Sequence, residues 1–234
     1  MVLAAKIFEI KEDVDLNAIA QKLKDFRREE PYQGKKGETK LVTEISDLKL
    51  EESSLSGVFS KDFVRKRYYR RESDEYPVTE EAAFRINRFN RRTLLIVLAP
   101  SGASALKKLL TNYIANELSE ALFMRLGAIV EMRLSHETLR KLHESTPQAT
   151  KLIWFDDIDI PGVGKLSLAG PSVANTKLYK DYLEHGKIWY VVFEVQKRGI
   201  TVGIARNFVV TLFSKGTIDE FINYISEDLL TLTE

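Results

Sequence analysis

The feature that most constrains the fold is a strand-turn-helix segment that occurs twice. One copy, 94–118, reads LLIVLAPSGASALKKLLTNYIANEL, and the other, 208–229, reads FVVTLFSKGTIDEFINYISEDL. In each copy a short apolar run leads into a turn with Ser and Gly and then into an amphipathic helix carrying Asn-Tyr-Ile at its middle. A unit used twice predicts two related halves.

The first half, 1–124, is predicted to begin with a strand at 2–11 and a helix from 16 to about 28, capped by Asp15. Polar residues and glycines at 28–40 indicate a mobile loop. Four strands should follow, and then a helix from 103 or 104 to about 123. The strands are expected at 41–50, 55–71, 82–89 and 94–98, with turns at 51–54 and 72–77.

The second half, 125–234, repeats this order. A strand at 129–133 precedes a helix capped by Ser135, and the last helix begins with the T-x-x-E capping box of Thr217 and Glu220. A short extra helix is expected at 177–184. The strands are expected at 151–157, 165–169, 187–196 and 200–213, the last as one continuous strand.

These orders predict an α+β protein made of two tandem β-α-β4-α repeats, with helices on one face of a mainly antiparallel sheet. This element order resembles the fold of the TATA-box-binding protein family, whose two repeats each run strand, helix, four strands, helix. The resemblance extends over nearly the whole chain in element order but includes no family sequence motif. It implies one curved sheet with helices on its convex side, which is a shape and not a function.

The amino-acid composition limits the chemistry and the cellular location that we expect of this chain. The 234 residues contain no cysteine, which excludes disulfides and thiolate chemistry. No apolar run reaches the roughly 18–20 residues that a membrane helix needs, and the N-terminus is charged, so we expect a cytoplasmic protein without membrane contact. The absence of cysteine and the many Lys and Glu residues are typical of thermophile compositions. A net charge of +1 means that any electropositive surface must be local.

The strongest local signal is a basic and aromatic segment, KDFVRKRYYRR at 61–71. Residues 61–92 hold ten basic and six acidic side chains. On a strand, alternation places 61, 63, 65, 67, 69 and 71 on one face, with 64, 66, 68 and 70 on the other. Guanidinium groups pair with phosphate while aromatic rings stack on unpaired bases. We therefore predict DNA or RNA binding by a β-ribbon, with these residues: Lys61, Arg65, Lys66, Arg67, Tyr68, Tyr69, Arg70, Arg71 and Arg88.

Two alternatives remain. The ribbon, or an open sheet face, could instead serve a protein-interaction or assembly module, with a partner protein or a homodimer as the product. Trp189, Val191 and Phe193 share one face of their strand with apolar residues opposite, which indicates a covered central strand or, if the sheet is open, a partner-binding patch.

The second alternative is a metal-dependent nuclease centred on Asp156, Asp157 and Asp159, because hard cations prefer carboxylate oxygens. The spacing of the histidines and serines indicates no catalytic set. The leading interpretation is therefore non-enzymatic, with no catalytic residue, metal ligand or cofactor.

Overall fold

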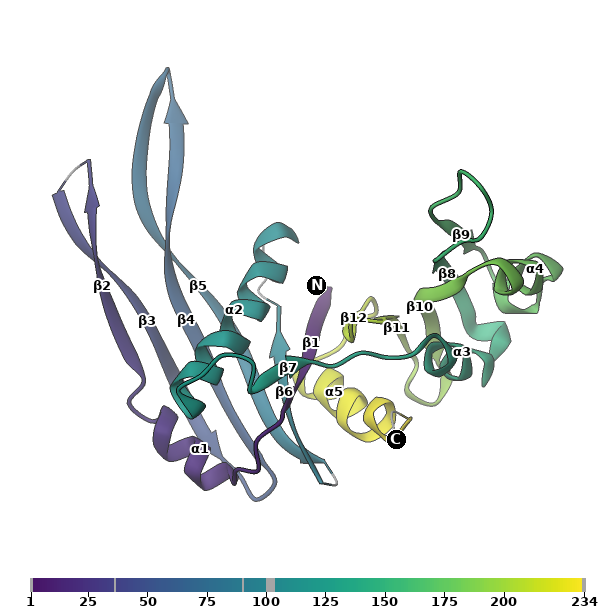
Figure 1. Ribbon diagram of the computed structural model, residues 1–234, viewed down its shortest axis with the longest axis horizontal. Helices are drawn as coiled ribbons and strands as arrows, with labels where there is room; N and C mark the ends of the chain where they lie inside the picture. Colours follow the sequence, from purple (N-terminus) through teal and green to yellow (C-terminus); the bar gives the residue numbers. More distant parts are fainter. Residues whose placement is uncertain (1, 36, 90, 100–103, 233–234) are drawn as a thin grey trace. The chain divides into compact units, whose positions relative to one another are not determined.

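The computed structural model describes residues 2–35, 37–89, 91–99 and 104–232, without the side chains of 104–109 and 232 (Figure 1). The described chain is α+β, with five α-helices and antiparallel strand pairing. It divides into two compact units. The first unit is Phe8–Val130, and the second unit combines the residues up to Ile7 with those from Glu131 onward.

The first unit is an antiparallel meander with two helices. Its strands follow one another in the sheet in chain order, β2-β3-β4-β5-β6. The elements are the end of β1 (Leu3–Ile10), α1 (Leu16–Leu23), β2 (Arg27–Gly34), β3 (Gly37–Leu50), β4 (Ser54–Tyr69), β5 (Glu72–Phe89), β6 (Arg92–Leu98) and α2 (Ser104–Phe123).

One hydrophobic core holds this unit together. The Asp15 side chain accepts hydrogen bonds from the backbone N–H groups of Asn17 and Ala18, which begins α1 where the sequence predicts it. Apolar residues of α1 and α2, such as Ile19 and Ile114, are fully buried with Phe59 and other sheet residues. The apolar sides of both helices therefore cover one face of the meander.

The expected mobile loop at 28–40 is wrong, and α1 ends at Leu23 instead of near residue 28. The segment forms the β2–β3 hairpin, paired from Arg27 opposite Glu44 to Gly34 opposite Gly37. The hairpin is exposed and held partly by cross-strand ion pairs, including Lys40 with Glu29 at 2.7 Å. Exposed strands show no apolar alternation, so the sequence lacks the usual strand signal here.

The expected turn at 72–77 is also wrong. β5 begins at Glu72, and the turn consists of Arg70 and Arg71, which both have positive φ (45° and 73°). Consequently neither arginine belongs to an alternating strand face. Pro77, which suggested the turn, lies opposite Val64 where β5 has no second neighbour, since β6 pairs only with Phe84–Phe89. Proline is tolerated on such an edge.

The second unit has the strand order β1-β12-β11-β10-β8-β9. The short strand β7 (Ile129–Glu131) leads into it. Its other elements are α3 (His136–Glu144), β8 (Thr150–Asp156), β9 (Leu166–Ala169), α4 (Lys177–His185), β10 (Lys187–Val195), β11 (Ile200–Ala205), β12 (Val209–Leu212) and α5 (Ile218–Asn223), with a π-helical turn at Tyr224–Leu229 and 3-10 turns at Pro147–Ala149, Val173–Asn175, Gln196–Arg198 and Leu230–Leu232.

The sequence signals for helix starts were accurate in this unit, but one of its strand predictions was not. The Ser135 cap, the reciprocal capping box of Thr217 and Glu220, and the extra helix α4 are confirmed. The single strand expected at 200–213 is wrong, because a turn at 206–208 divides it into β11 and β12 and gives Phe208 a φ of 53°.

A bulge at Trp189 also breaks the alternation expected along β10, because Ile188 and Tyr190 pair with adjacent residues of β8. Ile188 is fully buried, as is Val191, while Trp189 and Tyr190 are half-buried. Trp189 therefore does not share a face with Val191 in the way strict alternation requires.

The α+β class and the antiparallel sheet are confirmed, whereas the tandem repeats remain a prediction. Each unit has five strands after its capped helix where the repeat requires four, and the second unit also carries α4. Within the described ranges, no helix is both long and apolar enough to cross a bilayer.

Candidate nucleic-acid interface

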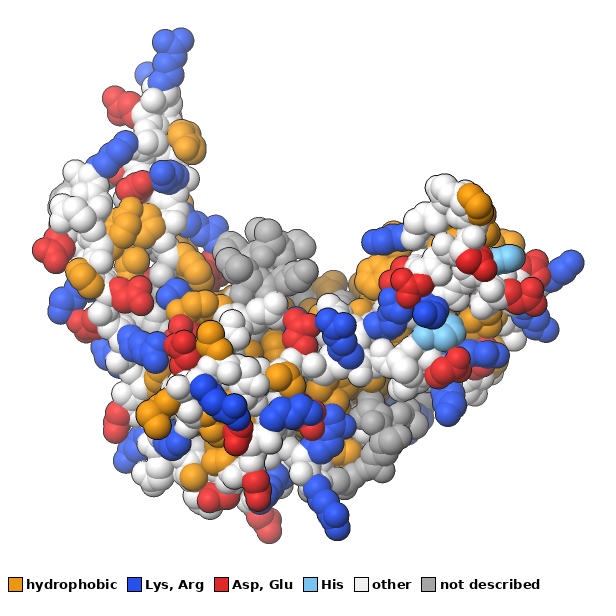
Figure 2. All heavy atoms as spheres, in the orientation of Figure 1, with side chains coloured by type: hydrophobic (Ala, Val, Ile, Leu, Met, Phe, Trp, Pro, Cys, Tyr) orange, Lys and Arg blue, Asp and Glu red, His pale blue; other side chains and the backbone are white. Residues whose placement is uncertain are grey.

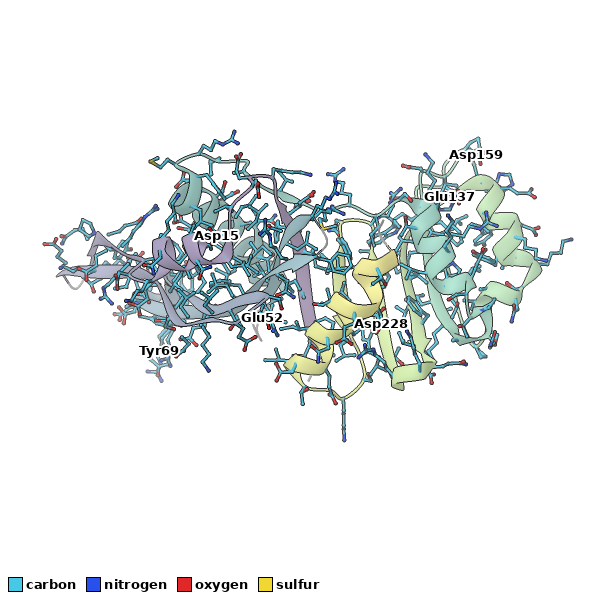
Figure 3. The ribbon with its side chains drawn as sticks, turned by 90° about the horizontal axis from the view of Figure 1, so that it is seen from below. Asp15, Glu52, Tyr69, Glu137, Asp159 and Asp228 are labelled. Carbon is cyan, nitrogen blue, oxygen red and sulfur yellow. The ribbon has the colours of Figure 1, made fainter. Side chains whose placement is uncertain are left out.

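The predicted basic segment forms a two-stranded ribbon, defined here as residues 61–80. β3 pairs with β4 only as far as Thr43 opposite Lys61, while β4 and β5 stay paired to Tyr69 opposite Glu72. Beyond Lys61 the ribbon therefore leaves the sheet (Figure 1). Tyr69, labelled in Figure 3, is the last residue of β4 before the turn.

The β2–β3 hairpin supports the ribbon from one side. Where the two hairpins separate, Asp62 accepts hydrogen bonds from the Val42 N–H (2.8 Å) and the Thr79 hydroxyl (2.6 Å). Nearer the tip, Tyr32 donates to Glu75 at 2.8 Å, and Lys35 donates to the Ser73 carbonyl at 3.2 Å. The ribbon is thus positioned by side-chain contacts along much of its length.

These contacts also set the ionisation of the groups involved. The hydrogen bond from Tyr32, together with Lys66, lowers the pKa of the Glu75 carboxyl below its usual value. The same bond raises the pKa of the Tyr32 phenol. At neutral pH, Glu75 is therefore a charged acceptor that holds the β2–β3 hairpin against the ribbon.

Four of the predicted binding residues have partners within the protein. Lys61 donates to the Tyr113 hydroxyl at 2.7 Å and lies 4.4 Å from the centre of that ring, where it is half-buried. Arg65 pairs with Glu80. The remaining two pairs are Lys66 with Glu75 at 3.3 Å and Arg88 with Asp13 at 3.2 Å.

The other five predicted residues are consecutive and exposed, and we call them the tip: Arg67, Tyr68, Tyr69, Arg70 and Arg71. Tyr68 is 76% and Tyr69 64% exposed, so both rings are available for stacking. The Arg70 guanidinium lies 5.5 Å from the centre of the Tyr69 ring. Across the described chain, no ion pair forms with any arginine of the tip. Figure 2 shows Lys and Arg side chains at this end of the ribbon.

The turn at the tip is an unusual place for two arginines. A two-residue hairpin turn with positive φ at both positions normally contains Asn-Gly or a similar pair. An L-residue other than glycine pays about 1–2 kcal/mol for the left-handed conformation. Arg70 and Arg71 both adopt it, so the fold carries two guanidinium groups at a position where smaller residues would be more stable.

The aspartates of the nuclease alternative are each engaged by a basic side chain. Asp156 pairs with Arg206, and Asp157 lies 3.7 Å from Lys187 and 3.6 Å from Arg206. Asp159 contacts His185 Nδ1 at 2.9 Å. Within the described residues, no group of three His, Asp or Glu side chains could hold a metal ion. This arrangement gives the nuclease interpretation no support.

The sequence interpretation missed the contribution of the β2–β3 hairpin. Tyr32 and Lys35 contact the ribbon, but both lie in the segment expected to be a loop. The one available signal was that Glu29 and Lys40 carry opposite charges on either side of two glycines, Gly34 and Gly37. These glycines lie opposite each other where the hairpin reverses, and the two charged side chains form an ion pair. Neither the protein-family models nor the curated proteins compared with this chain gave a match.

Proposed function

We propose that this protein binds nucleic acid through the tip of its β-ribbon and catalyses no reaction on it. The observation behind the proposal is that the basic residues near the sheet and those at the tip differ in whether they have partners. Lys61, Arg65 and Lys66 have partners within the protein, whereas the arginines of the tip form no ion pair with a described residue and lie beside two exposed tyrosines. The positive charge that is free to meet a polyanion is therefore concentrated at the tip.

The chemistry of the tip suits single-stranded DNA or RNA. Guanidinium groups form paired hydrogen bonds with phosphate oxygens. Tyrosine rings stack on bases that are not held in a duplex, and each stacked base contributes about 1–3 kcal/mol. Three arginines and two tyrosines in five residues combine both contacts over a short stretch of strand.

The other predicted residues differ in how firmly the protein holds them. Lys66 and Arg88 are exposed, and solvent screens surface ion pairs such as theirs, so both can exchange a carboxylate for a phosphate. Lys61 is the least available, because Tyr113 holds it at a half-buried position.

The test is fluorescence anisotropy with labelled single- and double-stranded DNA and RNA at low and moderate salt, with and without magnesium. Replacing Arg67, Arg70 and Arg71 with Gln should weaken binding and reduce the slope of log K against log salt by about 2, since each phosphate contact to a single strand contributes about 0.7. The control replaces three exposed lysines, Lys141, Lys177 and Lys180, with Gln.

Equal affinity and slope for the two triple variants would contradict the proposal. If the wild-type protein fails to bind at low salt and forms a discrete oligomer, the interaction-module alternative takes its place. Magnesium-dependent cleavage that is lost on Asp157→Asn would favour the nuclease alternative.

We also infer that the two units derive from one duplicated β-α-β4-α unit, as the matched sequence segments indicate. Each unit begins with a capped helix after its first strand, with Asp15 in one and Ser135 in the other, and each ends with a helix carrying Asn-Tyr-Ile. Nucleic-acid binding is proposed only for the first unit, because the basic ribbon has no counterpart in the second.

A further inference from the structure

The second unit contains a charged pocket of about 540 Å³. Four segments line it: residues 133–136, which include the first residue of α3, the end of β8, the start of β10, and the turn between β11 and β12. On the face shown in Figure 2, basic and acidic side chains gather around a histidine in the region that α3 occupies in Figure 1. Figure 3 labels Glu137 at the start of this helix.

Hydrogen bonds join the four segments and give the pocket its shape. The Arg206 N–H donates to the Trp189 carbonyl and the Leu134 N–H to the Arg206 carbonyl, both at 2.8 Å. The Ile188 N–H donates to His136 Nδ1 at 2.7 Å. Arg206 also pairs with Asp156. The lining is therefore fixed by the fold before any ligand arrives.

Three buried polar atoms of the lining have no hydrogen-bond partner among the described residues: Asp156 Oδ1, Trp189 Nε1 and Asn207 Oδ1. Leaving such an atom without a partner costs about 1–3 kcal/mol, so native proteins seldom do it without a reason. The carboxylate oxygen accepts and the indole N–H donates, while the Asn207 amide can present either its oxygen or its nitrogen. The pocket thus offers unmet acceptors beside an unmet donor.

The charge of the lining favours an anion. Three cations, Arg133, Lys187 and Arg206, line the pocket with a single carboxylate, that of Asp156. Arg133 is exposed and forms no ion pair with a described residue. Asp157, adjacent to the lining, approaches Lys187 and Arg206 at 3.6 Å or more. The pocket therefore retains an excess of positive charge at neutral pH.

His136 contributes a neutral ring. Burial lowers the pKa of its imidazole. Glu137 raises this pKa, while the nearby cations Arg140, Arg206 and Lys187 lower it further. Since Nδ1 accepts the Ile188 N–H, the neutral ring carries its proton on Nε2. Glu137 Oε1 lies 3.8 Å from that nitrogen.

The start of α3 adds further donors. This helix has nine residues, and the Ser135 side chain caps it by accepting the Thr138 N–H. The first amide N–H groups of a helix have no acceptor within it and carry partial positive charge, which makes them a phosphate-binding feature. Ser135 and His136 both line the pocket together with Arg133, so the first residue of α3 belongs to the lining, whereas the Thr138 N–H is already bound by Ser135.

We propose that this pocket binds a small phosphate ester with free hydroxyl groups, of the sugar-phosphate or nucleoside-monophosphate class. The phosphate lies against Arg133 and the start of α3. Its hydroxyl groups donate to Asp156 Oδ1 and to the Asn207 amide, and a ligand oxygen accepts the Trp189 indole N–H. The proposal does not depend on the ribbon.

The test is calorimetric titration of the full chain at low ionic strength with ribose 5-phosphate, inorganic phosphate and ribose. Ribose 5-phosphate should bind at least about tenfold more tightly than inorganic phosphate, since it alone meets both the cations and the unpartnered atoms. Ribose should bind most weakly. Arg133→Gln should weaken both phosphate compounds about tenfold or more, whereas Asn207→Ala should weaken ribose 5-phosphate alone.

The control is Lys180→Gln, which removes an exposed cation of α4 away from this pocket and should leave all three affinities unchanged. The indole N–H signals of the two tryptophans provide a second measurement, with Trp189→Phe to assign them. Ribose 5-phosphate should shift the Trp189 signal.

An unmoved Trp189 signal would overturn the proposal. Equal affinities for ribose 5-phosphate and inorganic phosphate would do so too, as would equal effects of Arg133→Gln and Lys180→Gln. The tip variant with Arg67, Arg70 and Arg71 replaced should bind ribose 5-phosphate normally, so failure of the nucleic-acid proposal would leave this result intact.

Discussion

His143 is a fully buried histidine of the second unit, and both of its ring nitrogens lie near hydroxyl groups. Thr150 Oγ1 is 3.3 Å from Nδ1 and the Tyr179 hydroxyl is 3.2 Å from Nε2. Burial lowers the pKa of His143 to about 4. Burial also raises the pKa of Tyr179, whose hydroxyl donates to Glu144 at 2.8 Å. The cluster is thus built for a neutral imidazole.

Acidification should therefore destabilise the protein through His143. The unfolded chain binds a proton near pH 6.5, while the folded chain resists it until pH about 4, so the free energy of unfolding falls as pH drops through this window. The free energy of unfolding should be about 3 kcal/mol higher at neutral pH than below pH 4 because of His143 alone. Chemical denaturation of wild type and His143→Gln between pH 4 and 7.5 measures it.

In that comparison, His143→Gln should flatten the pH dependence, and the same change at exposed His185 is the control. Parallel pH profiles for wild type and His143→Gln would show that the buried ring does not couple folding to protonation.

Gly203 is a residue whose missing side chain is required by packing. A Cβ built there would lie 2.2 Å from the Tyr190 hydroxyl and 2.9 Å from Phe213 Cε2. Gly203→Ala should therefore destabilise the second unit by about 1–3 kcal/mol, the usual cost of overpacking. A Cβ built at Gly164 would have no described atom within 4 Å beyond its chain neighbours, so Gly164→Ala is the matched control. Thermal unfolding measures both.

The Gly203 prediction has an internal check. Replacing Tyr190 with Ala in the Gly203→Ala background removes the closest clash, so the two changes together should cost less than the sum of each alone. Strict additivity would indicate that the ring of Tyr190 does not lie over Gly203.

At the scale of elements, we expect the same substitution in the ribbon turn to change stability and nucleic-acid affinity in opposite directions. Replacing Arg70-Arg71 with Asn-Gly keeps the positive φ values but removes the unfavourable left-handed conformations of two arginines. The variant should be more stable by about 1–2 kcal/mol, and it should bind single-stranded nucleic acid more weakly. Denaturant unfolding and anisotropy on the same variant test both parts.

A control for this turn is Lys49→Gln on β3, which removes an exposed cation without changing a turn. A more stable Asn-Gly variant with wild-type affinity would place the binding charge elsewhere on the chain. Lower stability would show that Arg70 and Arg71 have contacts that compensate for their backbone conformation.

At the scale of the whole molecule, the nearly balanced charge limits how this protein can meet a polyanion. With 35 basic and 34 acidic residues, no long-range field attracts nucleic acid, and affinity must come from a few contacts at short range. The proposed interface is accordingly small, and its salt dependence should be modest beside that of proteins with extended basic faces.

The sequence by itself determined the features that depend on near neighbours in the chain. The helix caps at Asp15, Ser135 and Thr217 are confirmed because a cap needs only a side chain and the next few backbone N–H groups. The α+β class follows in the same way, since apolar periodicity within a segment reports whether it is a helix or a strand.

Only the tertiary structure decided which distant residues meet. The β2–β3 hairpin is held partly by ion pairs between strands, the bulge at Trp189 depends on pairing with β8, and the pocket collects side chains from four segments. Pairing partners and register are set by contacts across the sheet, which local periodicity does not encode. For the same reason, only the tertiary structure separated the arginines of the tip, which have no ion-pair partner among the described residues, from the paired cations below them.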